Sequence, residues 1–247
     1  MSHYKEKSLS LVSNLSTVSS LHLWFARVGE TTQIIESQIE SILSPSEKSR
    51  LQATHSKSKQ REYLLSRALM RHALQQHFPS EKSSFQFIEQ PHSTPVINNL
   101  PSNNFISLSH SKGMICFALA DSPVGVDLEM KRQRNFAEMA KIFMSKKELT
   151  VFLNSTNDLE DEFYMIWSAK EAYYKAQPSQ IQMNLNFTDI SISNLRAKEK
   201  PSTLLEWNNT RFALAVVLEQ QPKHIQYHSF LDSVSLDIMQ QLMTHQQ

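Results

Sequence analysis

Glycine is scarce in this chain of 247 residues, which contains only Gly29, Gly113 and Gly125. Average proteins contain about 7% glycine. The spacing of these three residues fits neither G-x-G-x-x-G nor G-x-x-x-x-G-K, so the glycine-rich loops of Rossmann folds and P-loop proteins are both excluded. A phosphate-bearing ligand would therefore have to be held by side chains and cations.

Only one cysteine is present, and long apolar runs and a dominant charge are missing. The single Cys116 excludes an intrachain disulfide and every multi-cysteine metal site. No run approaches the ~18 apolar residues of a membrane span, and residues 1–20 lack the apolar core of a secretory signal. The net charge of +1 gives no support for a nucleic-acid partner. We expect a cytoplasmic protein with a flexible N-terminus over residues 1–20, binding neither nucleic acid nor membrane.

The sequence pattern predicts a mixture of strands and helices. Apolar patterning indicates strands at 21–28, 105–111, 114–120 and 124–130, and three or four more within 187–227. Helical spacing indicates long helices over 57–77 and 159–176. Capping residues predict three further helix starts, at Ser44 with Glu47, Asn135 with Glu138, and Ser145 with Glu148. A weak amphipathic tail covers 234–243.

The order of these elements suggests two similar halves. Strands and helices alternate in a comparable way on either side of Pro123. We therefore predict an α+β fold built from two α+β subdomains, 21–122 and 123–230, followed by a C-terminal tail over 231–247.

One predicted strand combines apolar alternation with two carboxylates. In Val124-Gly125-Val126-Asp127-Leu128-Glu129-Met130, the glycine and both acids share one face. Carboxylates two residues apart stand roughly 6.5–7 Å apart at Cα and can converge on one cation. Oxygen ligands favour Mg²⁺ or Mn²⁺ over zinc, and Gly125 leaves room beside them for a ligand. Taken alone, a solvated strand face is the alternative interpretation.

The helix over 159–176 carries a lysine within an aromatic stripe. One helical face bears Phe163, Trp167, Lys170 and Tyr174. The charge of Lys170 must reach solvent or find an anionic partner. Glu171 and Lys175, four residues apart, form either a helix-stabilising ion pair or a carboxylate of a metal site beside a lysine that meets phosphate charge.

A histidine ends the strand over 105–111. In Ser109-His110-Ser111 the imidazole precedes a turn, where it can donate a hydrogen bond to a phosphate. A lone histidine is more often structural, and the other nine form no metal-ligand spacing such as H-E-x-x-H.

In combination, these motifs resemble those of the surfactin-type 4′-phosphopantetheinyl transferases. The family patterns G-[VI]-D-[IVL]-E and W-[ST]-x-K-E-[AS]-x-x-K match residues 125–129 and 167–175 without exception. The separation of about forty residues between them also fits, and the similarity extends from about Leu21 to Ala176 in detail. The resemblance implies two subdomains related by a pseudo-twofold axis, with coenzyme A in the cleft between them, in a monomer.

The resemblance also implies an activity and a role for each motif residue. The enzyme would transfer the phosphopantetheine arm of coenzyme A to a serine of an apo acyl or peptidyl carrier protein, releasing 3′,5′-bisphosphoadenosine. Asp127, Glu129 and Glu171 would hold Mg²⁺, with Mn²⁺ as a substitute. Glu171 would accept the serine proton and Lys175 would assist the leaving phosphate. The remaining implied contacts to coenzyme A come from Arg61, Ser109, His110 and Lys170.

Some questions stay open at this level. Many relatives have Gly-Lys-Pro before the histidine strand, whereas this chain has Ser93-Thr94-Pro95 and lacks that lysine. The alternatives are a Mg²⁺-dependent phosphodiesterase acting on coenzyme A or a nucleotide, and a non-catalytic module that binds carrier proteins. The sequence does not decide whether a carrier would serve fatty-acid, polyketide or nonribosomal peptide synthesis.

Overall fold

The computed structural model describes residues 19–29, 33–81, 85–90, 94–197 and 202–230. Its strands are β1 (Ser20–Arg27), β2 (Gln86–Ile88), β3 (Val96–Asn98), β4 (Phe105–Ser111), β5 (Met114–Ala120), β6 (Val124–Met130), β7 (Thr203–Asn208), β8 (Phe212–Leu218) and β9 (His224–Phe230). Its helices are α1 (Gln33–Ser41), α2 (Pro45–Gln52), α3 (Lys57–His77), α4 (Phe136–Phe143), α5 (Lys146–Leu153), α6 (Leu159–Ala176), α7 (Ser179–Gln182) and α8 (Ile192–Arg196). The predicted α+β class is confirmed.

The strands form two larger sheets and a small hairpin. One sheet has the order β4-β5-β1-β9 and the other has the order β6-β8-β7, while β2 pairs with β3. Pairing is antiparallel except between β1 and β9, which run parallel. In both larger sheets the first strand lies beside the second strand of a later hairpin: β1 beside β5, and β6 beside β8.

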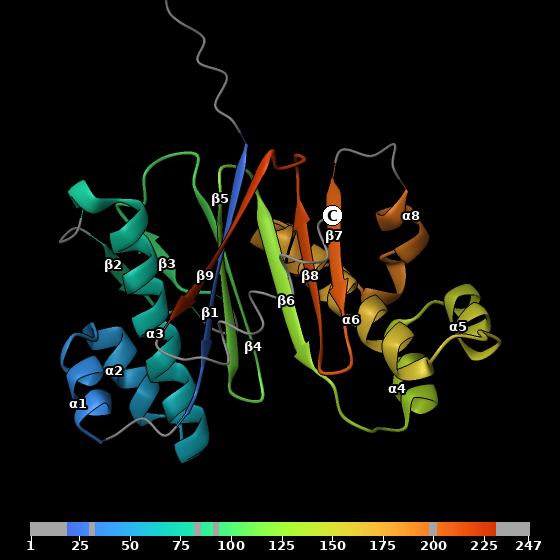
Figure 1. Ribbon diagram of the computed structural model, residues 1–247, viewed down its shortest axis with the longest axis horizontal. Coiled ribbons are helices and arrows are strands. Elements are labelled where there is room, and N and C mark those ends of the chain that lie inside the picture. Colours follow the sequence, from blue (N-terminus) through green and yellow to red (C-terminus); the bar gives the residue numbers. More distant parts are fainter. Residues whose placement is uncertain (1–18, 30–32, 82–84, 91–93, 198–201, 231–247) are drawn as a thin grey trace, which may run out of the picture.

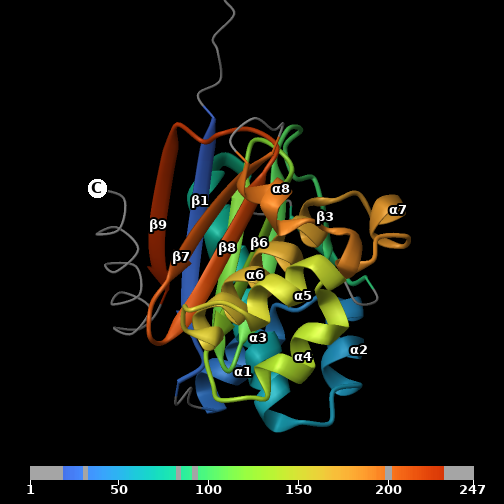
Figure 2. The ribbon, with the colours of Figure 1, turned by 90° about the vertical axis from the view of Figure 1, so that its right-hand side faces the viewer.

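The two larger sheets meet at the centre of the molecule, with helices on their outer sides. Figure 1 shows α1 to α3 outside the sheet that contains β1, and α4 to α6 outside the sheet that contains β6. Figure 2, turned by 90°, shows α4, α5 and α6 in front of β6 and β8. The central core joins both sheets through buried side chains such as Leu23, Cys116, Val126 and Leu214. Apolar burial of this extent is the main force that holds the halves together.

Local sequence signals explain where the helices begin. Ser44 and Ser145 each accept a hydrogen bond from the backbone of a glutamate three residues on, whose carboxylate bonds the capping residue in return. The Asn135 side chain likewise accepts a hydrogen bond from the Glu138 backbone, but the cap does not include a return bond from the Glu138 carboxylate. The three predicted helix starts are therefore confirmed.

The sequence reading was less accurate near the C-terminal end. Residues 187–196, expected to be part of a strand region, form a 3₁₀ turn (Phe187–Asp189) and the short helix α8. Strand β9, counted with the second half, joins the first sheet beside β1 instead. A parallel neighbour of this kind depends on a long-range contact that no local pattern encodes. Of the N-terminal segment 1–20 that was expected to be flexible, residues 1–18 lie outside the described residues, while Ser20 begins β1. The expected tail over 231–247 also lies outside the described residues.

Within the described residues, no helix combines the length and the apolar character that a membrane span requires.

Candidate active site

A cavity of about 680 Å³ lies where α3, β4, β6 and α6 approach one another. Its lining includes most of the residues that the sequence motifs single out: Ser109, His110, Asp127, Glu129, Glu171 and Lys175. These side chains come from both predicted halves of the chain. The fold therefore gathers motifs more than sixty residues apart into one cavity.

Asp127 stands at the centre of this group and is 4% exposed. Its Oδ1 accepts hydrogen bonds from Ser109 Oγ at 3.0 Å and from Lys175 Nζ at 2.7 Å. Its Oδ2 is buried and has no hydrogen-bond partner in the described structure. Because an unpartnered buried carboxylate oxygen is costly, this atom is suited to a further positive ligand.

Glu129, two residues along β6, is held in a similar way. Oε2 accepts from Ser111 Oγ at 2.7 Å, and Oε1 accepts from the indole Nε1 of Trp167 at 3.2 Å. Burial and the negative charge of Asp127 raise the pKa of Glu129. Hydrogen bonds thus hold the carboxylates of Asp127 and Glu129 close together despite their electrostatic repulsion, as expected for carboxylates that share a cation.

Glu171 reaches the same region from α6. Burial, the largest cause, and the charges of Asp127 and Glu129 together raise the pKa of this carboxyl group to about 7. Lys175 acts in the opposite direction, from 4.0 Å away. A carboxyl group with such a pKa can exchange a proton near neutral pH.

Lys175 is the cation that contacts two of the three acids, Asp127 and Glu171. Burial alone would lower its pKa, but the charges of Asp127 and Glu171 more than compensate, so the pKa of Lys175 is raised. The ammonium group therefore stays charged. Its closest acidic partner is Asp127 rather than Glu171, which lies four residues before it on α6. The expected ion pair within the helix is thus the weaker of the two contacts.

His110 faces the cavity from the end of β4 and pairs with an acid that the sequence reading missed. Its Nδ1 lies 3.2 Å from Oε1 of Glu62 on α3. Burial would raise the pKa of Glu62, but His110 and Lys59 lower it to about 2. Glu62 is therefore an anion that holds His110 and Lys59 at the rim of the cavity.

Other lining residues were also missed. Arg50, Lys59 and Tyr63 line the cavity from α2 and α3, and the side chains of Arg50 and Lys59 are 45% and 59% exposed. Helical periodicity could have grouped Lys59 with Tyr63, because residues four apart share a face. No local signal could have shown that this face looks toward Asp127.

Two predicted coenzyme A contacts lie elsewhere. Arg61 is absent from the lining and pairs with Glu36, Nε to Oε1 at 2.8 Å. Lys170 is fully buried, and its Nζ donates to Glu148 and to the backbone oxygens of Phe143 and Phe187. The structure therefore places Lys170 within the packing of the second half. The anionic partner expected for a lysine in an aromatic stripe is Glu148.

Gly125 also has a different environment from the one expected. A Cβ atom at this position would lie 1.9 Å from the carbonyl oxygen of Ala172 in α6. The room beside Gly125 is therefore filled by the backbone of α6, and no ligand can enter there. Close helix-to-strand packing is what this glycine permits.

The described residues contain no ready-made metal centre. Among them, no three His, Cys, Asp or Glu side chains form a group arranged to hold a metal ion. Asp127, Glu129 and Glu171 nevertheless line one cavity, and the charge of Asp127 contributes to the raised pKa of both Glu129 and Glu171. Their donor atoms are all oxygens, which suits Mg²⁺ or Mn²⁺ rather than zinc.

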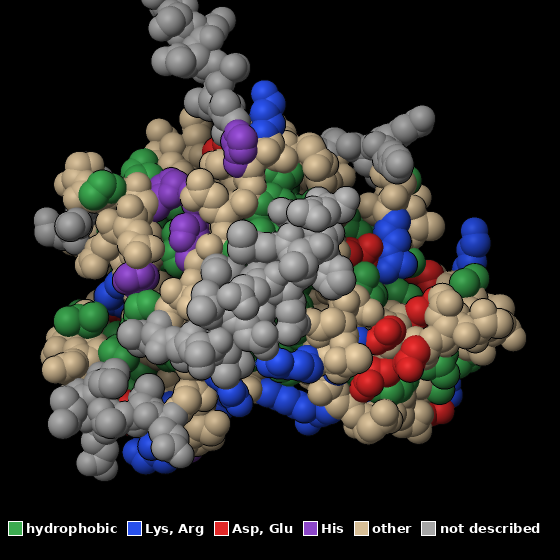
Figure 3. All heavy atoms as spheres, in the orientation of Figure 1, with side chains coloured by type: hydrophobic (Ala, Val, Ile, Leu, Met, Phe, Trp, Pro, Cys, Tyr) green, Lys and Arg blue, Asp and Glu red, His purple; other side chains and the backbone are tan. Residues whose placement is uncertain are grey.

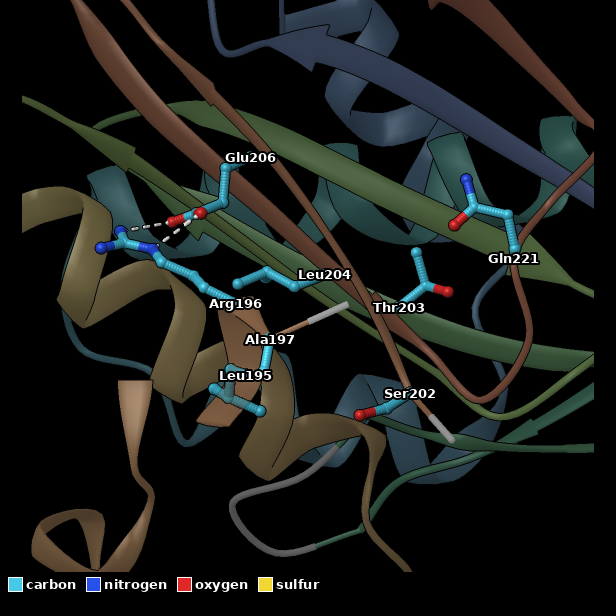
Figure 4. A pocket seen from close by; sticks show the side chains of 8 residues that line it. All are labelled: Leu195, Arg196, Ala197, Ser202, Thr203, Leu204, Glu206 and Gln221. Carbon is cyan, nitrogen blue, oxygen red and sulfur yellow. Dashed lines mark hydrogen bonds and ion pairs between the residues drawn. The ribbon is translucent and has the colours of Figure 1, made fainter. Parts of the chain in front are cut away.

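A second cavity, of about 530 Å³, lies between α8 and β7, away from these motifs. Figure 4 shows its two charged side chains, Arg196 and Glu206, directed at each other. The guanidinium donates from two nitrogens to the two carboxylate oxygens, at 2.9 and 2.7 Å. Because each charge neutralises the other, this cavity offers no free acid, base or phosphate-binding cation among its lining residues.

Comparison with known proteins points to one class. Residues 123–234 match the model of the 4′-phosphopantetheinyl transferase superfamily. This segment contains Asp127, Glu129, Glu171 and Lys175, so the match covers the acidic side of the cavity.

Particular relatives agree with that match. The 4′-phosphopantetheinyl transferase Sfp of Bacillus subtilis is 29% identical over 147 residues, which are 59% of this chain and 65% of Sfp. The transferase psf-1 of Bacillus pumilus is 28% identical over 51% of this chain and 54% of its own length. HetI of Nostoc is 26% identical over 66% of this chain and 71% of its own length. The aligned region thus spans less than two thirds of Sfp and of psf-1. The resemblance to the surfactin-type transferases is confirmed.

Proposed function

We propose that this protein transfers the 4′-phosphopantetheine arm of coenzyme A to a serine hydroxyl of an apo acyl or peptidyl carrier protein. The observation that carries the proposal is the convergence of Asp127, Glu129, Glu171 and Lys175 on one cavity, within the segment that matches the transferase family. The leaving product would be 3′,5′-bisphosphoadenosine. Both the enzyme and its carrier would be cytoplasmic, with the enzyme acting as a monomer.

The reaction is a phosphoryl transfer. The serine Oγ would attack the phosphorus that bears the pantetheine arm, and the bond from that phosphorus to the bridging pyrophosphate oxygen would break. Such a reaction requires positioning and charge neutralisation more than covalent chemistry. A chain without a glycine-rich loop can provide both with side chains.

The three carboxylates fit a divalent cation. Asp127 keeps a buried oxygen without a partner among the described residues, and burial together with the charge of Asp127 raises the pKa values of Glu129 and Glu171. We assign these three residues as the ligands of Mg²⁺, with Mn²⁺ as a substitute. When bound, the cation would neutralise the charge of the pyrophosphate.

Glu171 and Lys175 would move the protons. The carboxylate of Glu171 is able to accept the proton of the attacking serine, directly or through a water molecule. Lys175 keeps its charge and carries a proton on Nζ, so it can donate to the phosphate that leaves. Division of the two tasks between an acid and a lysine avoids the need for one group to do both.

The basic rim would bind the nucleotide phosphates. Arg50, Lys59 and His110 come from the first half of the chain. They line the same cavity as the acidic residues of β6 and α6, which belong to the second half. We infer that Arg50 and Lys59 replace the lysine that the Ser93-Thr94-Pro95 segment lacks, because Thr94 and Pro95 also line this cavity. His110 would contact the phosphates, whereas the Ser109 hydroxyl is bonded to Asp127 and is not assigned to coenzyme A. Arg61 and Lys170 are not assigned to coenzyme A.

The proposal includes a division of the fold into two related subdomains, 21–122 and 123–230. It is supported by the common pattern of a strand, a group of helices and a hairpin whose second strand returns beside the first, found for β1 with β5 and for β6 with β8. The coenzyme A cavity would lie across the pseudo-twofold axis between them. Strand β9 would be an addition to this common pattern, pairing with β1 at the edge of the first sheet.

The deciding experiment is incubation with coenzyme A, Mg²⁺ and an apo carrier protein, followed by intact mass measurement of the carrier. The proposal requires the carrier to gain the phosphopantetheine arm, and a Glu171→Gln variant to be far slower. Consumption of coenzyme A without gain of mass would indicate a phosphodiesterase. Carrier binding with neither change would indicate a non-catalytic module.

A further inference from the structure

The two larger sheets are joined by a row of serine side chains. Strands β4 and β6 are edge strands of different sheets and do not pair through their backbones. Instead, the backbone N–H groups of β6 donate to serine hydroxyls of β4, with three bonds at the same offset: Val126 to Ser107, Leu128 to Ser109, and Met130 to Ser111, at 3.0, 3.0 and 3.1 Å. The hydroxyls take the place of the carbonyl groups that an edge strand otherwise lacks.

Two of these hydroxyls have a second partner. A serine hydroxyl has one hydrogen to donate besides its acceptor sites. Ser109 donates that hydrogen to Asp127 Oδ1 at 3.0 Å, and Ser111 donates to Glu129 Oε2 at 2.7 Å. Ser107 has the backbone bond of the same row but, among the residues that the structure describes, no carboxylate partner of this kind. The register that joins the sheets therefore also fixes the direction of both acids of β6.

The hydrogen bonds to Asp127 occupy only one of its two carboxylate oxygen atoms. Ser109 and Lys175 occupy Oδ1, whereas the buried Oδ2 of Asp127 has no partner within the described part of the chain. Because a carboxylate has two oxygen atoms in one plane, holding one of them decides where the other points. The side chain of Ser109 is itself almost fully buried, so this orientation is not averaged by solvent.

We propose that Ser109 and Ser111 are positioning residues that preorganise Asp127 and Glu129 for the divalent cation. This inference rests on the proposed function, because it takes these acids as metal ligands. Hydrogen-bond partners of metal-ligating carboxylates orient the ligand atoms, and their loss costs about 10- to 100-fold in metal affinity or activity. The same serines would transmit any shift between the two sheets directly to the metal ligands.

The test compares three alanine variants from the same row: Ser107→Ala, Ser109→Ala and Ser111→Ala. Mn²⁺ binding is measured by electron paramagnetic resonance, for the protein alone and for the protein with saturating coenzyme A. Thermal unfolding gives the structural cost of each lost backbone bond. Ser107→Ala is the matched control, since it loses the link between sheets but leaves both carboxylates held.

We expect Ser109→Ala and Ser111→Ala to weaken Mn²⁺ binding by about 10- to 100-fold, while Ser107→Ala keeps wild-type affinity despite a similar loss of thermal stability. Ser111→Thr, which retains the hydroxyl, should restore Mn²⁺ affinity. Equal Mn²⁺ affinity in all three alanine variants, with a wild-type protein that binds Mn²⁺ and loads carrier, would overturn the positioning role alone. A wild-type protein that neither binds Mn²⁺ nor loads carrier would overturn the proposed function and this inference together.

Discussion

Gly125 of β6 lies against the backbone of Ala172 in α6, so that a Cβ atom on the glycine would stand 1.9 Å from the alanine carbonyl oxygen. This contact sets the distance between the strand that carries Asp127 and the helix that carries Glu171. We predict that Gly125→Ala destabilises the protein by about 3 kcal/mol or more, because overpacking against rigid backbone cannot be relieved by a side-chain movement.

Gly29 provides the control for this substitution. A Cβ atom there meets nothing within 4 Å, so Gly29→Ala should unfold at a denaturant concentration close to that of the wild type. The measurement is chemical denaturation followed by circular dichroism. Equal midpoints for the two variants would contradict the packing role of Gly125.

Asp127→Asn should abolish most of the carrier-loading rate while the fold is kept. The amide retains an oxygen to accept from Ser109, but it removes the charge that Lys175 and a cation require. A loss of at least about 100-fold is expected if the metal supplies several kcal/mol of charge stabilisation. Loading rates at increasing Mg²⁺, with circular dichroism as the folding control, decide this. A near-normal rate at millimolar Mg²⁺ would remove Asp127 from the metal site.

Lys170→Met should act on stability rather than on coenzyme A. The buried ammonium bonds Glu148 and two backbone oxygens, so its removal leaves those acceptors short of a donor. The loss of one partner from a buried ion pair costs about 3–5 kcal/mol. Thermal melting should therefore shift strongly for Lys170→Met but not for the exposed Lys147→Met. A raised KM for coenzyme A, with unchanged stability, would restore Lys170 to the substrate site.

The histidines between β1, β9 and α3 should make the fold sensitive to acid. Figure 3 shows histidine side chains gathered on this face. Nδ1 of His22 lies 3.4 Å from Nε2 of His228, and the His77 ring packs edge-on at 4.5 Å. Burial, followed by the charges of His77 and His228, lowers the pKa of His22 to about 4, against the opposing attraction of Asp121.

The sign of the effect follows from proton binding. Between pH 6.5 and 4 the unfolded chain binds a proton at His22 that the folded protein does not, so the free energy of unfolding falls on acidification. We expect a loss on the order of 1–3 kcal/mol from this residue. Urea unfolding from pH 7 to pH 4 should show a shallower dependence for His22→Gln than for the wild type, with exposed His55→Gln as the control. Parallel profiles for all three proteins would exclude His22 as the cause.

Much of the secondary structure was predictable because its signals are local. The limits of α3, β4, β5, β6 and α6 follow from apolar periodicity, from capping side chains and from prolines. The alternation in β6, which places Asp127 and Glu129 on one face, follows from strand geometry alone. The motifs were therefore placed on the correct elements before any tertiary contact was known.

What only the tertiary structure decided is which of these side chains meet. Lys170 and Lys175 are both lysines of one helix, yet one is buried against Glu148 and the other reaches Asp127, because the packing of α6 separates its faces. The row from Ser107 to Ser111, the contact of Glu62 with His110 and the return of β9 to β1 all join segments distant in the chain. Local patterns are fixed by backbone geometry over a few residues, whereas these contacts depend on how complete elements bury their apolar faces against one another.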